Sequence, residues 1–418
     1  MASEEQSRMA QSIRMHLAME TEDVLGRISM DEAPQAMGYF YRKLRQFFQQ
    51  PEGLGHFDKP GIGTFCAQVP LELIEAAGAR PVRLCMAAGI WDQAGGELLP
   101  AKSCSVVKAM AGMAASQLFF SGVCAVVAPT TCDGKKKCAD LIETMGIAVH
   151  RLEMPPSKLS RAARNYWRES VETFMAQLQG WTKQKITRKS LHTAIHRRLM
   201  ATEQFRRLCR LQTKGVLRAV DYFLVTQTGF FDDVEAWTLA LSDLCAELEA
   251  RVAEGRGIEK QNRPRMLLTG SPVLFPNIKV PLWIEQAGGP IVTDELCSAT
   301  DMFHDAPAYD ETCLHDMVSA LCDRYLSPCV CACLSPNPDR IRKMISLCRQ
   351  ARVDGVVYQT FSGCLSYAME RNAVAKALAD EKLPLLYIET DAGFEDQGQL
   401  STRIDAFIES VQAKRRNF

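Results

Sequence analysis

Cysteine is the residue type with the clearest chemical potential in this sequence, because 16 of the 418 residues are cysteines. This content is too dilute for a secreted disulfide scaffold, which is usually a short chain. In a reducing compartment cysteines remain thiols, and a surplus of thiols indicates metal binding or redox chemistry. The competing interpretation treats free cysteines as small buried hydrophobic residues. It is favoured for three cysteines in helical patterns: Cys209, Cys245 and Cys348.

The spacing of cysteines and histidines argues against several common metal sites. The sequence contains no C-x-x-C pair, which disfavours zinc ribbons, thioredoxin-like motifs and bacterial ferredoxin runs. His192 and His196 lie four residues apart, but the segment HTAIH lacks the glutamate of the H-E-x-x-H zinc motif. We interpret this histidine pair as a surface or core feature.

Several cysteines fall where strands are expected to end. Open α/β sheets bind ligands beyond the carboxyl ends of their strands, where helix N-termini point inward. Four cysteines lie at or just after predicted strand ends: Cys85, Cys132, Cys297 and Cys364. Connectivity places Cys66 and Cys104 on the same side. An iron–sulfur cluster held between two halves would suit this distribution, and packing cysteines or a redox-active thiol pair are the alternatives.

Two short segments add detail to this hypothesis. In PCVCACLSPN (328–337), three alternating cysteines would face the same way if the stretch is extended. In TTCDGKKK (130–137), Cys132 would end a strand and the following helix start would stabilise anionic sulfur. Lys135 and Lys136 could add positive charge for a cluster or for the phosphates of a bound thioester cofactor. The alternative is a solvated lysine face.

Strand and helix patterns divide the chain into four parts. Short apolar strands alternate with helices in two regions, which predicts an α/β fold with doubly wound parallel sheets. The expected strands span residues 80–84, 123–128, 148–152, 265–268, 290–293, 355–359 and 385–388. We expect a helical N-terminal segment, a first α/β domain, a helical insert and a second α/β domain, at residues 1–58, 59–155, 156–262 and 263–418.

Local signals refine this division. Asp232 with Glu235 predicts a capping box ahead of an amphipathic helix. Asp396, in the same pattern with Gln399, predicts the start of a C-terminal helix. The two α/β regions share a strand, cysteine turn, helix and strand pattern, at residues 126–153 and 356–390. We therefore expect two related halves.

The overall composition is that of a globular protein, with 47% hydrophobic and 23% charged residues. Lys+Arg and Asp+Glu balance at 49 each, so no global charge favours nucleic acid or an anionic membrane. The polar start MASEEQSRMA predicts no secretory signal. The uncharged stretch 110–129 is interpreted as a helix end, a turn and a strand instead of a membrane span. A cytoplasmic protein is expected.

Taken together, these motifs resemble the 2-hydroxyacyl-CoA dehydratase family, which is related to benzoyl-CoA reductase subunits and double-cubane-cluster proteins. The resemblance covers roughly residues 60–412. It rests on separate segments in the right order: TFCAQVPLELIEAAGARPVRLC (64–85), KSCSVVKAMAG (102–112), TTCDGKKK (130–137), CACLSPN (331–337), GCLSYAMER (363–371) and IETDAGFEDQGQLSTRIDAFIE (388–409).

The resemblance implies two flavodoxin-like domains with an iron–sulfur cluster between them, in an oxygen-sensitive protein. It also implies low-potential electrons from an ATP-hydrolysing activator protein that carries its own cluster. In the dehydratases, a four-iron cluster with three cysteine ligands and one open iron site handles ketyl-radical elimination of water from a 2-hydroxyacyl-CoA. The double-cubane relatives instead hold an eight-iron pair of bridged cubanes, with more cysteine ligands, and reduce small molecules.

Carried over by position, the resemblance implies a set of cluster ligands: Cys66, Cys104, Cys132, Cys297, Cys364 and one or both of Cys331 and Cys333. This supply exceeds the three cysteines of a single four-iron cluster and therefore favours the double-cubane type. Two positions depart from the family pattern. Ser105 stands where the family often has proline, and Ser271 stands where it often has a cysteine.

Three functional hypotheses remain open. The first is a dehydratase-type redox enzyme that pairs with a homologous subunit and acts on an acyl-CoA. The second is a double-cubane reductase of small molecules that forms a homodimer, and the third is a non-enzymatic cluster carrier or degenerate subunit. Because the sequence has no G-x-x-x-x-G-K-[ST] motif, any ATP hydrolysis must belong to a partner. Residues 183–218, with eleven Lys/Arg and one acid, form a solvated face or a docking surface for an acidic partner or CoA phosphates.

Overall fold

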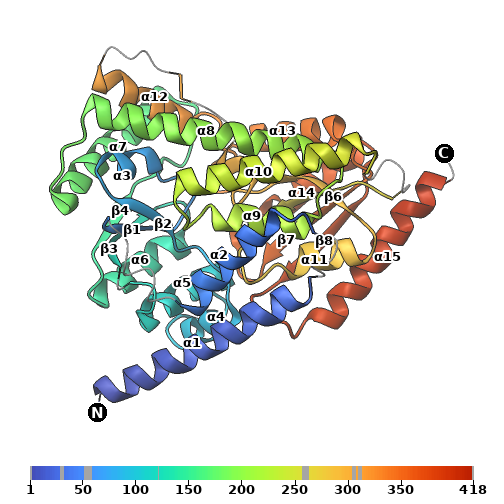
Figure 1. Cartoon of the computed structure of the whole chain (residues 1–418), viewed down its shortest axis with the longest axis horizontal. Coiled ribbons are helices and arrows are strands. Elements are labelled where there is room, and N and C mark those ends of the chain that lie inside the picture. The colour runs from blue at the N-terminus through green and yellow to red at the C-terminus, as the bar shows by residue number, and fades with distance from the viewer. Residues whose placement is uncertain are drawn as a thin grey trace.

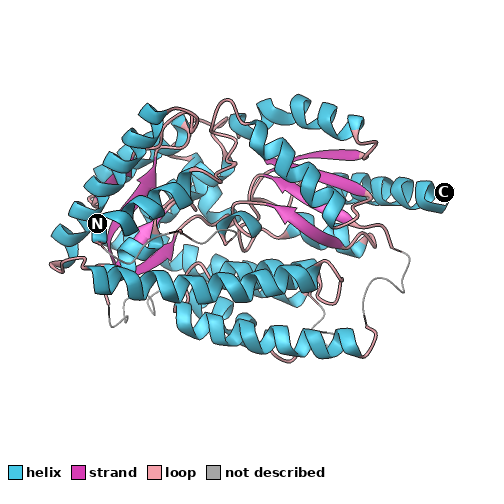
Figure 2. Cartoon of the chain, turned by 90° about the horizontal axis from the view of Figure 1, so that it is seen from above, coloured by secondary structure: helices cyan, strands magenta, loops and turns pink. Residues whose placement is uncertain are grey.

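The structure is a computed structural model that describes residues 2–28, 33–50, 59–120, 122–256, 263–303, 307–308 and 313–416. Its described residues form two four-stranded, all-parallel sheets covered by helices, as Figures 1 and 2 show. This confirms the predicted α/β class with two doubly wound, flavodoxin-like halves. No helix in these ranges combines the length and the apolar composition needed to cross a lipid bilayer.

The first sheet has the strand order β2-β1-β3-β4. Its strands are β1 (Gly61–Thr64), β2 (Arg80–Arg83), β3 (Val123–Pro129) and β4 (Val149–Leu152). The intervening helices are α3 (Leu71–Ala76), α4 (Gly89–Gly96), α5 (Ser105–Ser116) and α6 (Asp133–Thr144). Parallel strands require such crossover connections, which cover both faces of the sheet.

The second sheet repeats this topology in the order β6-β5-β7-β8. Its strands are β5 (Met266–Gly270), β6 (Ile291–Glu295), β7 (Gly355–Phe361) and β8 (Leu385–Thr390). The helices of this part of the chain are α11 (Lys279–Gln286), the 3-10 helix η3 (Thr300–Met302), α12 (Leu314–Leu326), α13 (Pro338–Gln350), α14 (Leu365–Asp380) and α15 (Gln397–Arg416). The matching strand orders confirm the two related halves that the sequence predicted.

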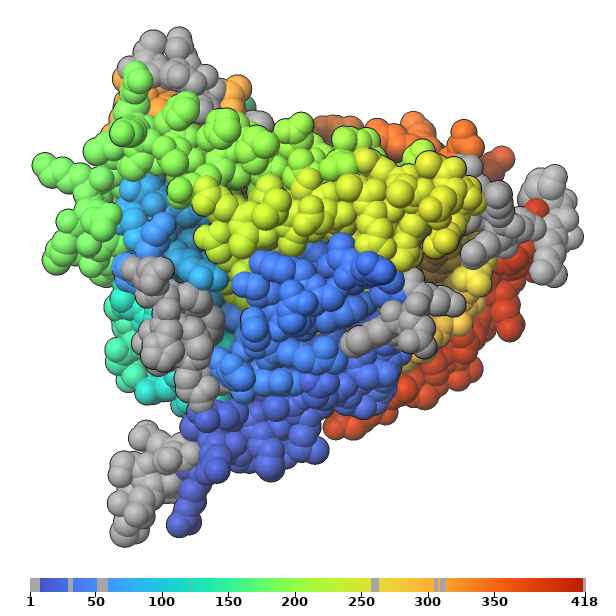
Figure 3. Space-filling view, in the orientation of Figure 1, coloured from blue at the N-terminus to red at the C-terminus, as the bar shows by residue number. Residues whose placement is uncertain are grey.

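The remaining helices join the two halves. They are α1 (Ala2–Gly26), α2 (Met37–Gln49), α7 (Arg161–Thr182), α8 (Arg188–Gln212), α9 (Ala219–Thr228) and α10 (Val234–Ala253). Helices α8 and α10 pack against each other and run along one side of the molecule past both sheets (Figures 1 and 2). In the space-filling view of Figure 3 these two helices form a continuous surface above α1 and α2. The halves are therefore held together by helices as well as by loops.

The largest hydrophobic core extends across both halves through α2. Phe47 of α2 stacks on Phe231 with ring centroids 3.8 Å apart. Phe48 lies 4.8 Å from Phe275 and 6.4 Å from Trp91. All these rings are buried, and burial of each aromatic side chain contributes favourable hydrophobic free energy. The N-terminal helices are thus part of the packing between the two halves.

All seven expected strands are present, with ends within two residues of the predicted positions. Strand β1 was missed because its sequence, GIGT, is short and contains two glycines, which are depleted in strands. Gly63 is required there, because an added Cβ would lie 2.6 Å from the Leu84 side chain. The centre of the first sheet therefore depends on a residue that weakens the strand signal.

One predicted helix cap differs from the structure. The N-cap of α10 is Asp233, whose carboxylate accepts hydrogen bonds from the backbone of the first turn. Asp232, the predicted cap, instead accepts from the Tyr39 hydroxyl at 2.6 Å and from Lys43 at 2.7 Å. The prediction was wrong by one residue because contacts with α2 occupy the Asp232 carboxylate. Asp396 directly precedes α15, as predicted, and its carboxylate accepts a hydrogen bond from the buried ammonium of Lys279.

Loops at the carboxyl ends of the two sheets meet directly. The backbone amide of Ser105 donates a 3.3 Å hydrogen bond to the carbonyl of Ser362. Gly363 has a φ of +77°, and an added Cβ would lie 2.5 Å from the Lys102 carbonyl oxygen and 2.8 Å from the Cys104 amide nitrogen. This close approach of two backbones requires glycine.

We expect Gly363→Ala to destabilise the protein more than Gly146→Ala. Both glycines have left-handed backbones, but an added Cβ at Gly146, whose φ is +83°, meets nothing within 4 Å. Gly146→Ala should therefore cost only the backbone strain of about 1–2 kcal/mol. Gly363→Ala should cost roughly 1–3 kcal/mol more because of overpacking. Urea denaturation of both variants measures the difference, and equal losses would contradict this account of the contact.

Candidate functional site

The predicted ligand cysteines lie at the carboxyl ends of both sheets. Three of them are N-cap residues of helices, namely Cys104 for α5, Cys132 for α6 and Cys364 for α14. Cys66 follows β1 and Cys297 follows β6. The positive end of a helix dipole favours the thiolate over the thiol. The local folds therefore position several sulfur atoms where negative charge is stabilised.

Thiols that are far apart in the sequence lie close enough to shift one another's pKa values. Cys104 from the first half interacts with Cys364 from the second. Cys132 from the first half interacts with Cys333 from the second, and Cys333 also interacts with Cys331. Cys364 also interacts electrostatically with Cys132, which links the two groups. Folding thus brings these five thiols to one place between the halves.

Lys135 is the positive charge in this group of thiols. Its half-buried ammonium interacts electrostatically with four sulfurs, those of Cys66, Cys85, Cys132 and Cys297. Burial by itself would lower the pKa of Lys135, but the surrounding thiols outweigh it and raise that pKa well above its usual value. The lysine therefore stays charged and stabilises thiolates around it.

The neighbouring lysines of α6 have a different environment. Lys136 is exposed and pairs with Asp133 at 3.2 Å, and the more exposed Lys137 pairs with Asp140 at 3.3 Å. The structure therefore brings Lys135 to the thiols and leaves Lys136 on the solvated face. One turn of an α-helix takes 3.6 residues, so successive residues are rotated by about 100° and adjacent lysines point in different directions.

The thiols differ in the direction in which their pKa values are shifted. The neighbouring Cys333 thiol lowers the pKa of Cys132, and the charge of Lys135 acts in the same direction. The Cys104 thiol likewise lowers the pKa of Cys364. The same interactions raise the pKa values of Cys104 and Cys333. The site therefore already contains sulfurs poised to bind a metal as thiolates.

The segment with three alternating cysteines contains a turn, so the condition under which all three side chains would face the same way is not met. The Leu334 amide donates to the Cys331 carbonyl at 3.0 Å, which closes the turn. Cys329 is buried, and its sulfur accepts a 3.0 Å hydrogen bond from Gln68 of the first half. The proline at 336 follows a cis peptide bond, a geometry that sequence alternation cannot predict.

Lys158 holds this turn in place from the first half of the chain. Its buried ammonium donates to the carbonyls of Ser327 and Cys329, both at 2.7 Å, and pairs with Asp339 at 2.9 Å. Lys158 gives no signal in the sequence, because an isolated lysine in a loop carries no motif. It becomes informative only when its burial is known.

Several other residues surround the thiols. Cys85 is buried near Lys135 and donates its proton to the Phe65 carbonyl. Tyr367 of α14 interacts electrostatically with Cys297 and Cys331. Ser271, at the position where the resemblance suggested a missing cysteine, hydrogen-bonds to Cys364 and accepts from the Phe361 amide at 3.1 Å. The serine therefore supports a thiol of the site.

The donor set suits an iron–sulfur cluster better than a single ion. Within the described ranges, no three His, Cys, Asp or Glu side chains converge as ligands of one metal ion. The ligands of a polynuclear cluster each contact a different iron, so they need not converge on one point. Soft thiols without accompanying histidines are the usual ligands of such clusters. All sixteen cysteines are free.

The remaining cysteines and basic residues lie elsewhere. Cys245 and Cys348 are buried in helices, as the packing interpretation predicted. His192 and His196 stack on α8 with ring centroids 6.4 Å apart. In the basic segment 183–218, arginines form ion pairs within the chain: Arg197 with Glu235, Arg198 with Glu75, Arg207 with Glu249 and Arg218 with Asp221.

Comparison with known proteins places the chain in a family. Residues 66–411 match the family model described as 2-hydroxyglutaryl-CoA dehydratase, D-component. The chain belongs to this family. It is 31% identical to the putative dehydratase subunit YjiM of Escherichia coli (strain K12) over 84% of this chain and 91% of that protein. It is 21% identical to the (R)-phenyllactyl-CoA dehydratase beta subunit of Clostridium sporogenes over 89% of this chain and 98% of that protein.

In the reduced, metal-free protein we expect Cys132 to be alkylated by iodoacetamide at lower pH than Cys245. The pKa of Cys132 is lowered, whereas burial raises the pKa of Cys245 to about 12. Lys135→Met should move the alkylation profile of Cys132 to higher pH, because a positive charge that favours the thiolate is lost. Peptide mass spectrometry across a pH series measures both profiles.

Lys136→Met is the matched control for this measurement. It removes the adjacent positive charge, which faces solvent and pairs with Asp133. The Cys132 profile should then stay unchanged. If both lysine variants shift the profile equally, Lys135 has no special relation to the thiols.

We expect Lys158→Met to lower the free energy of unfolding by about 1–3 kcal/mol, because the buried Cys329 carbonyl and the Ser327 carbonyl lose their donor. Lys137→Met, which removes an exposed side chain, should change it by less than about 0.5 kcal/mol. Urea denaturation compares the two variants with the wild type. A loss no larger than that of Lys137→Met would show that Lys158 does not hold the turn.

Proposed function

We propose that this chain is an iron–sulfur subunit of the 2-hydroxyacyl-CoA dehydratase type. The observation that carries the proposal is the network of thiols from both halves around Lys135. The family supports a lyase-type reaction on a thioester, since its model and both relatives are named for dehydratases. The ligands would come from the predicted set: Cys66, Cys104, Cys132, Cys297, Cys331, Cys333 and Cys364.

The residues of this chain would prepare the site for a cluster. Helix N-termini and Lys135 stabilise the thiolates, and Ser366 accepts a 3.6 Å hydrogen bond from Cys333. Cys66 and Cys85 are both buried on that side of the site. When bound, a cluster would supply one-electron transfer and an open iron site that polarises a hydroxyl or carbonyl oxygen.

The proposal requires partners. The phenyllactyl-CoA relative is named as a beta subunit, which supports pairing of this chain with a homologous subunit. Electrons of low potential would come from an ATP-hydrolysing activator with its own cluster, because this sequence has no phosphate-binding loop motif. Sixteen free thiols suit a reducing, cytoplasmic compartment.

A second candidate function is a double-cubane reductase of small molecules that acts as a homodimer. One observation favours it. The thiols that interact with one another include all seven predicted ligands. Cys297 interacts with Cys66 and with Cys331, which connects Cys66 and Cys297 to the other five cysteines. Three cysteines suffice for the four-iron cluster of a dehydratase, so the larger set suits an eight-iron cluster. A non-enzymatic cluster carrier or degenerate subunit would use the same fold without turnover.

Iron and acid-labile sulfide per chain, measured after anaerobic purification, distinguish these functions. About four irons per chain would support the dehydratase type, and about eight would support the double-cubane type. Absence of iron after anaerobic reconstitution would overturn both. Calorimetry with an acyl-CoA then separates an enzyme acting on thioesters from a reductase of small molecules.

Cys132→Ala is expected to lose most of the bound iron, because a metal ligand at the centre of the thiol network is removed. Cys245→Ala is the control, since Cys245 is a buried thiol of the helical core and lies outside the thiol network, whereas Cys132 is partly exposed. It should retain the iron content of the wild type and lose only packing, roughly 1 kcal/mol. Equal iron in both variants would rule out Cys132 as a ligand.

A further inference from the structure

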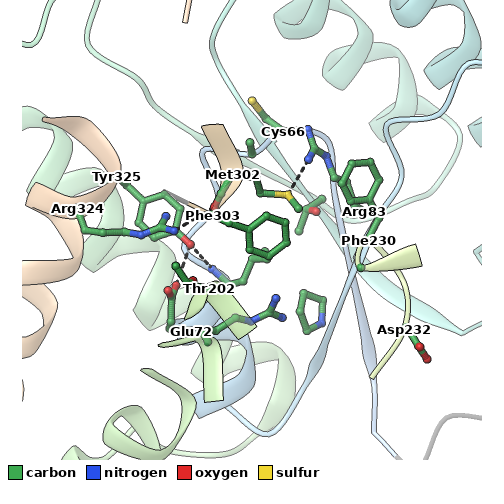
Figure 4. A pocket seen from close by; sticks show the side chains of 16 residues that line it. Cys66, Glu72, Arg83, Thr202, Phe230, Asp232, Met302, Phe303, Arg324 and Tyr325 are labelled. Carbon is green, nitrogen blue, oxygen red and sulfur yellow. Dashed lines mark hydrogen bonds between the residues drawn. The ribbon is translucent and has the colours of Figure 1, made fainter. Parts of the chain in front are cut away.

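Two adjoining cavities lie beside the thiols of the candidate site. The first is drawn in Figure 4 and shares Arg324 and Tyr325 with the second. The second cavity is bounded by Cys297, Cys331 and Tyr367, among other residues. Its volume of about 30 Å³ is only a little larger than the roughly 10–15 Å³ that one water molecule requires. The side chains that enclose so small a space lie close to one another.

The two tyrosines of the second cavity differ in what their hydroxyl groups contact. The Tyr325 hydroxyl donates a 2.8 Å hydrogen bond to the Glu72 carboxylate, as Figure 4 shows, and accepts one from the Leu71 amide at 3.2 Å. Within the described part of the chain, the Tyr367 hydroxyl has no hydrogen-bond partner. A hydroxyl that is removed from water without a partner costs free energy. The Tyr367 hydroxyl therefore favours an acceptor that becomes available when the site is loaded.

Sulfur atoms in the same cavity wall are suitable acceptors for this hydroxyl. Tyr367 interacts electrostatically with two thiols of the wall, those of Cys297 and Cys331, which are both predicted cluster ligands. Burial and these two thiols raise the pKa of Tyr367 well above its usual value, so the hydroxyl stays protonated and can donate to a thiolate. The carboxylate in the wall, Asp301, is instead paired with Lys343 at 2.7 Å. The two thiols are therefore the favoured acceptors.

Arg340 holds the ring of Tyr367 from the side away from the cavity. Its guanidinium carbon lies 4.9 Å from the ring centroid, within the range of a cation–π contact. Arg340 is 2% exposed and is itself fixed by ion pairs with Glu295 at 3.1 Å and with Glu370. The Tyr358 hydroxyl donates to the Tyr367 carbonyl at 2.8 Å, which also fixes the backbone. The position of the Tyr367 hydroxyl is therefore set by groups that do not line the cavity.

We propose that the Tyr367 hydroxyl donates a hydrogen bond to the sulfur of Cys297 or Cys331 in the bound cluster and thereby raises the reduction potential of that cluster. Arg340 is the positioning residue for this hydrogen bond. A hydrogen bond to sulfur disperses negative charge, so it stabilises the reduced state more than the oxidised state. This inference rests on the proposed function for the presence of a cluster. The alternative is a structural role, in which the hydroxyl pairs with the Gln68 carbonyl oxygen, which lines the same cavity and lacks a partner.

Tyr367→Phe tests the proposal in the full chain after anaerobic reconstitution with iron and sulfide. Loss of the hydroxyl should lower the equilibrium constant of one-electron reduction at least about threefold, which corresponds to a midpoint potential about 30 mV more negative. A redox titration followed by electron paramagnetic resonance measures this shift. The iron content should equal that of the wild type, because Tyr367 is not a ligand. An unchanged potential at full iron content would overturn the proposal, and loss of iron would overturn it by assigning Tyr367 to retention of the cluster.

Tyr325→Phe is the matched control, because it removes the same atom from the wall of the same cavity, where the hydroxyl bonds to Glu72. Its midpoint potential should equal that of the wild type. A shift as large as that of Tyr367→Phe would mean that any change in this cavity alters the potential, and it would overturn the specific role of the Tyr367 hydroxyl. Circular dichroism verifies that both variants are folded.

A double-mutant comparison tests the positioning role of Arg340. Arg340→Lys keeps the positive charge but loses the planar group that faces the ring. It should lower the potential in the otherwise wild-type chain and have little further effect when combined with Tyr367→Phe. Equal shifts in the two backgrounds would overturn the positioning role, because Arg340 would then act independently of the hydroxyl. Glu370→Gln, which weakens the ion pair that fixes Arg340, provides the same comparison if Arg340→Lys does not fold.

The same samples separate this inference from the proposed function. A wild-type chain without iron after reconstitution would overturn both, because no cluster would be present to accept the hydrogen bond. An iron-loaded chain whose potential does not respond to Tyr367→Phe would overturn this inference alone and leave the proposed function in place.

Discussion

The proposed cluster site requires that sulfur atoms, which become negatively charged when they bind metal, lie close together. Such atoms repel one another, so the fold must supply compensating positive charge at the place where they meet. Lys135 and the N-termini of three helices provide positive charge beside these thiols. This arrangement explains why the chemistry lies at the carboxyl ends of the strands, where helix N-termini converge.

Because the topology is repeated, each half contributes one side of the candidate site. Each sheet ends in loops that carry cysteines, and the close backbone contact at Gly363 joins these loops. The aromatic cluster of α2 and the pair of helices α8 and α10 fix the halves from the sides. Because each half supplies thiols, the site exists only in the assembled molecule. Lys158, which reaches from one half to the turn of the other, serves the same purpose.

Family membership and the geometry inform different levels of function. The match over residues 66–411 indicates a dehydratase-type subunit. One relative is named a putative dehydratase subunit and the other a phenyllactyl-CoA dehydratase subunit, whereas the family model is named for 2-hydroxyglutaryl-CoA, so these names do not agree on one acyl group.

The sequence by itself determined the two related α/β halves and the position of cysteines such as Cys132 and Cys364 after strands, because strand patterns and helix starts are local. It did not determine the cap at Asp233, the turn at Cys331 or the difference between Lys135 and Lys136. Those depend on burial and on partners distant in the chain, which local propensity does not contain. Only the folded arrangement shows which thiols interact and which cation faces them. The physical reason is that electrostatic and hydrogen-bonding energies depend on distances that only packing fixes.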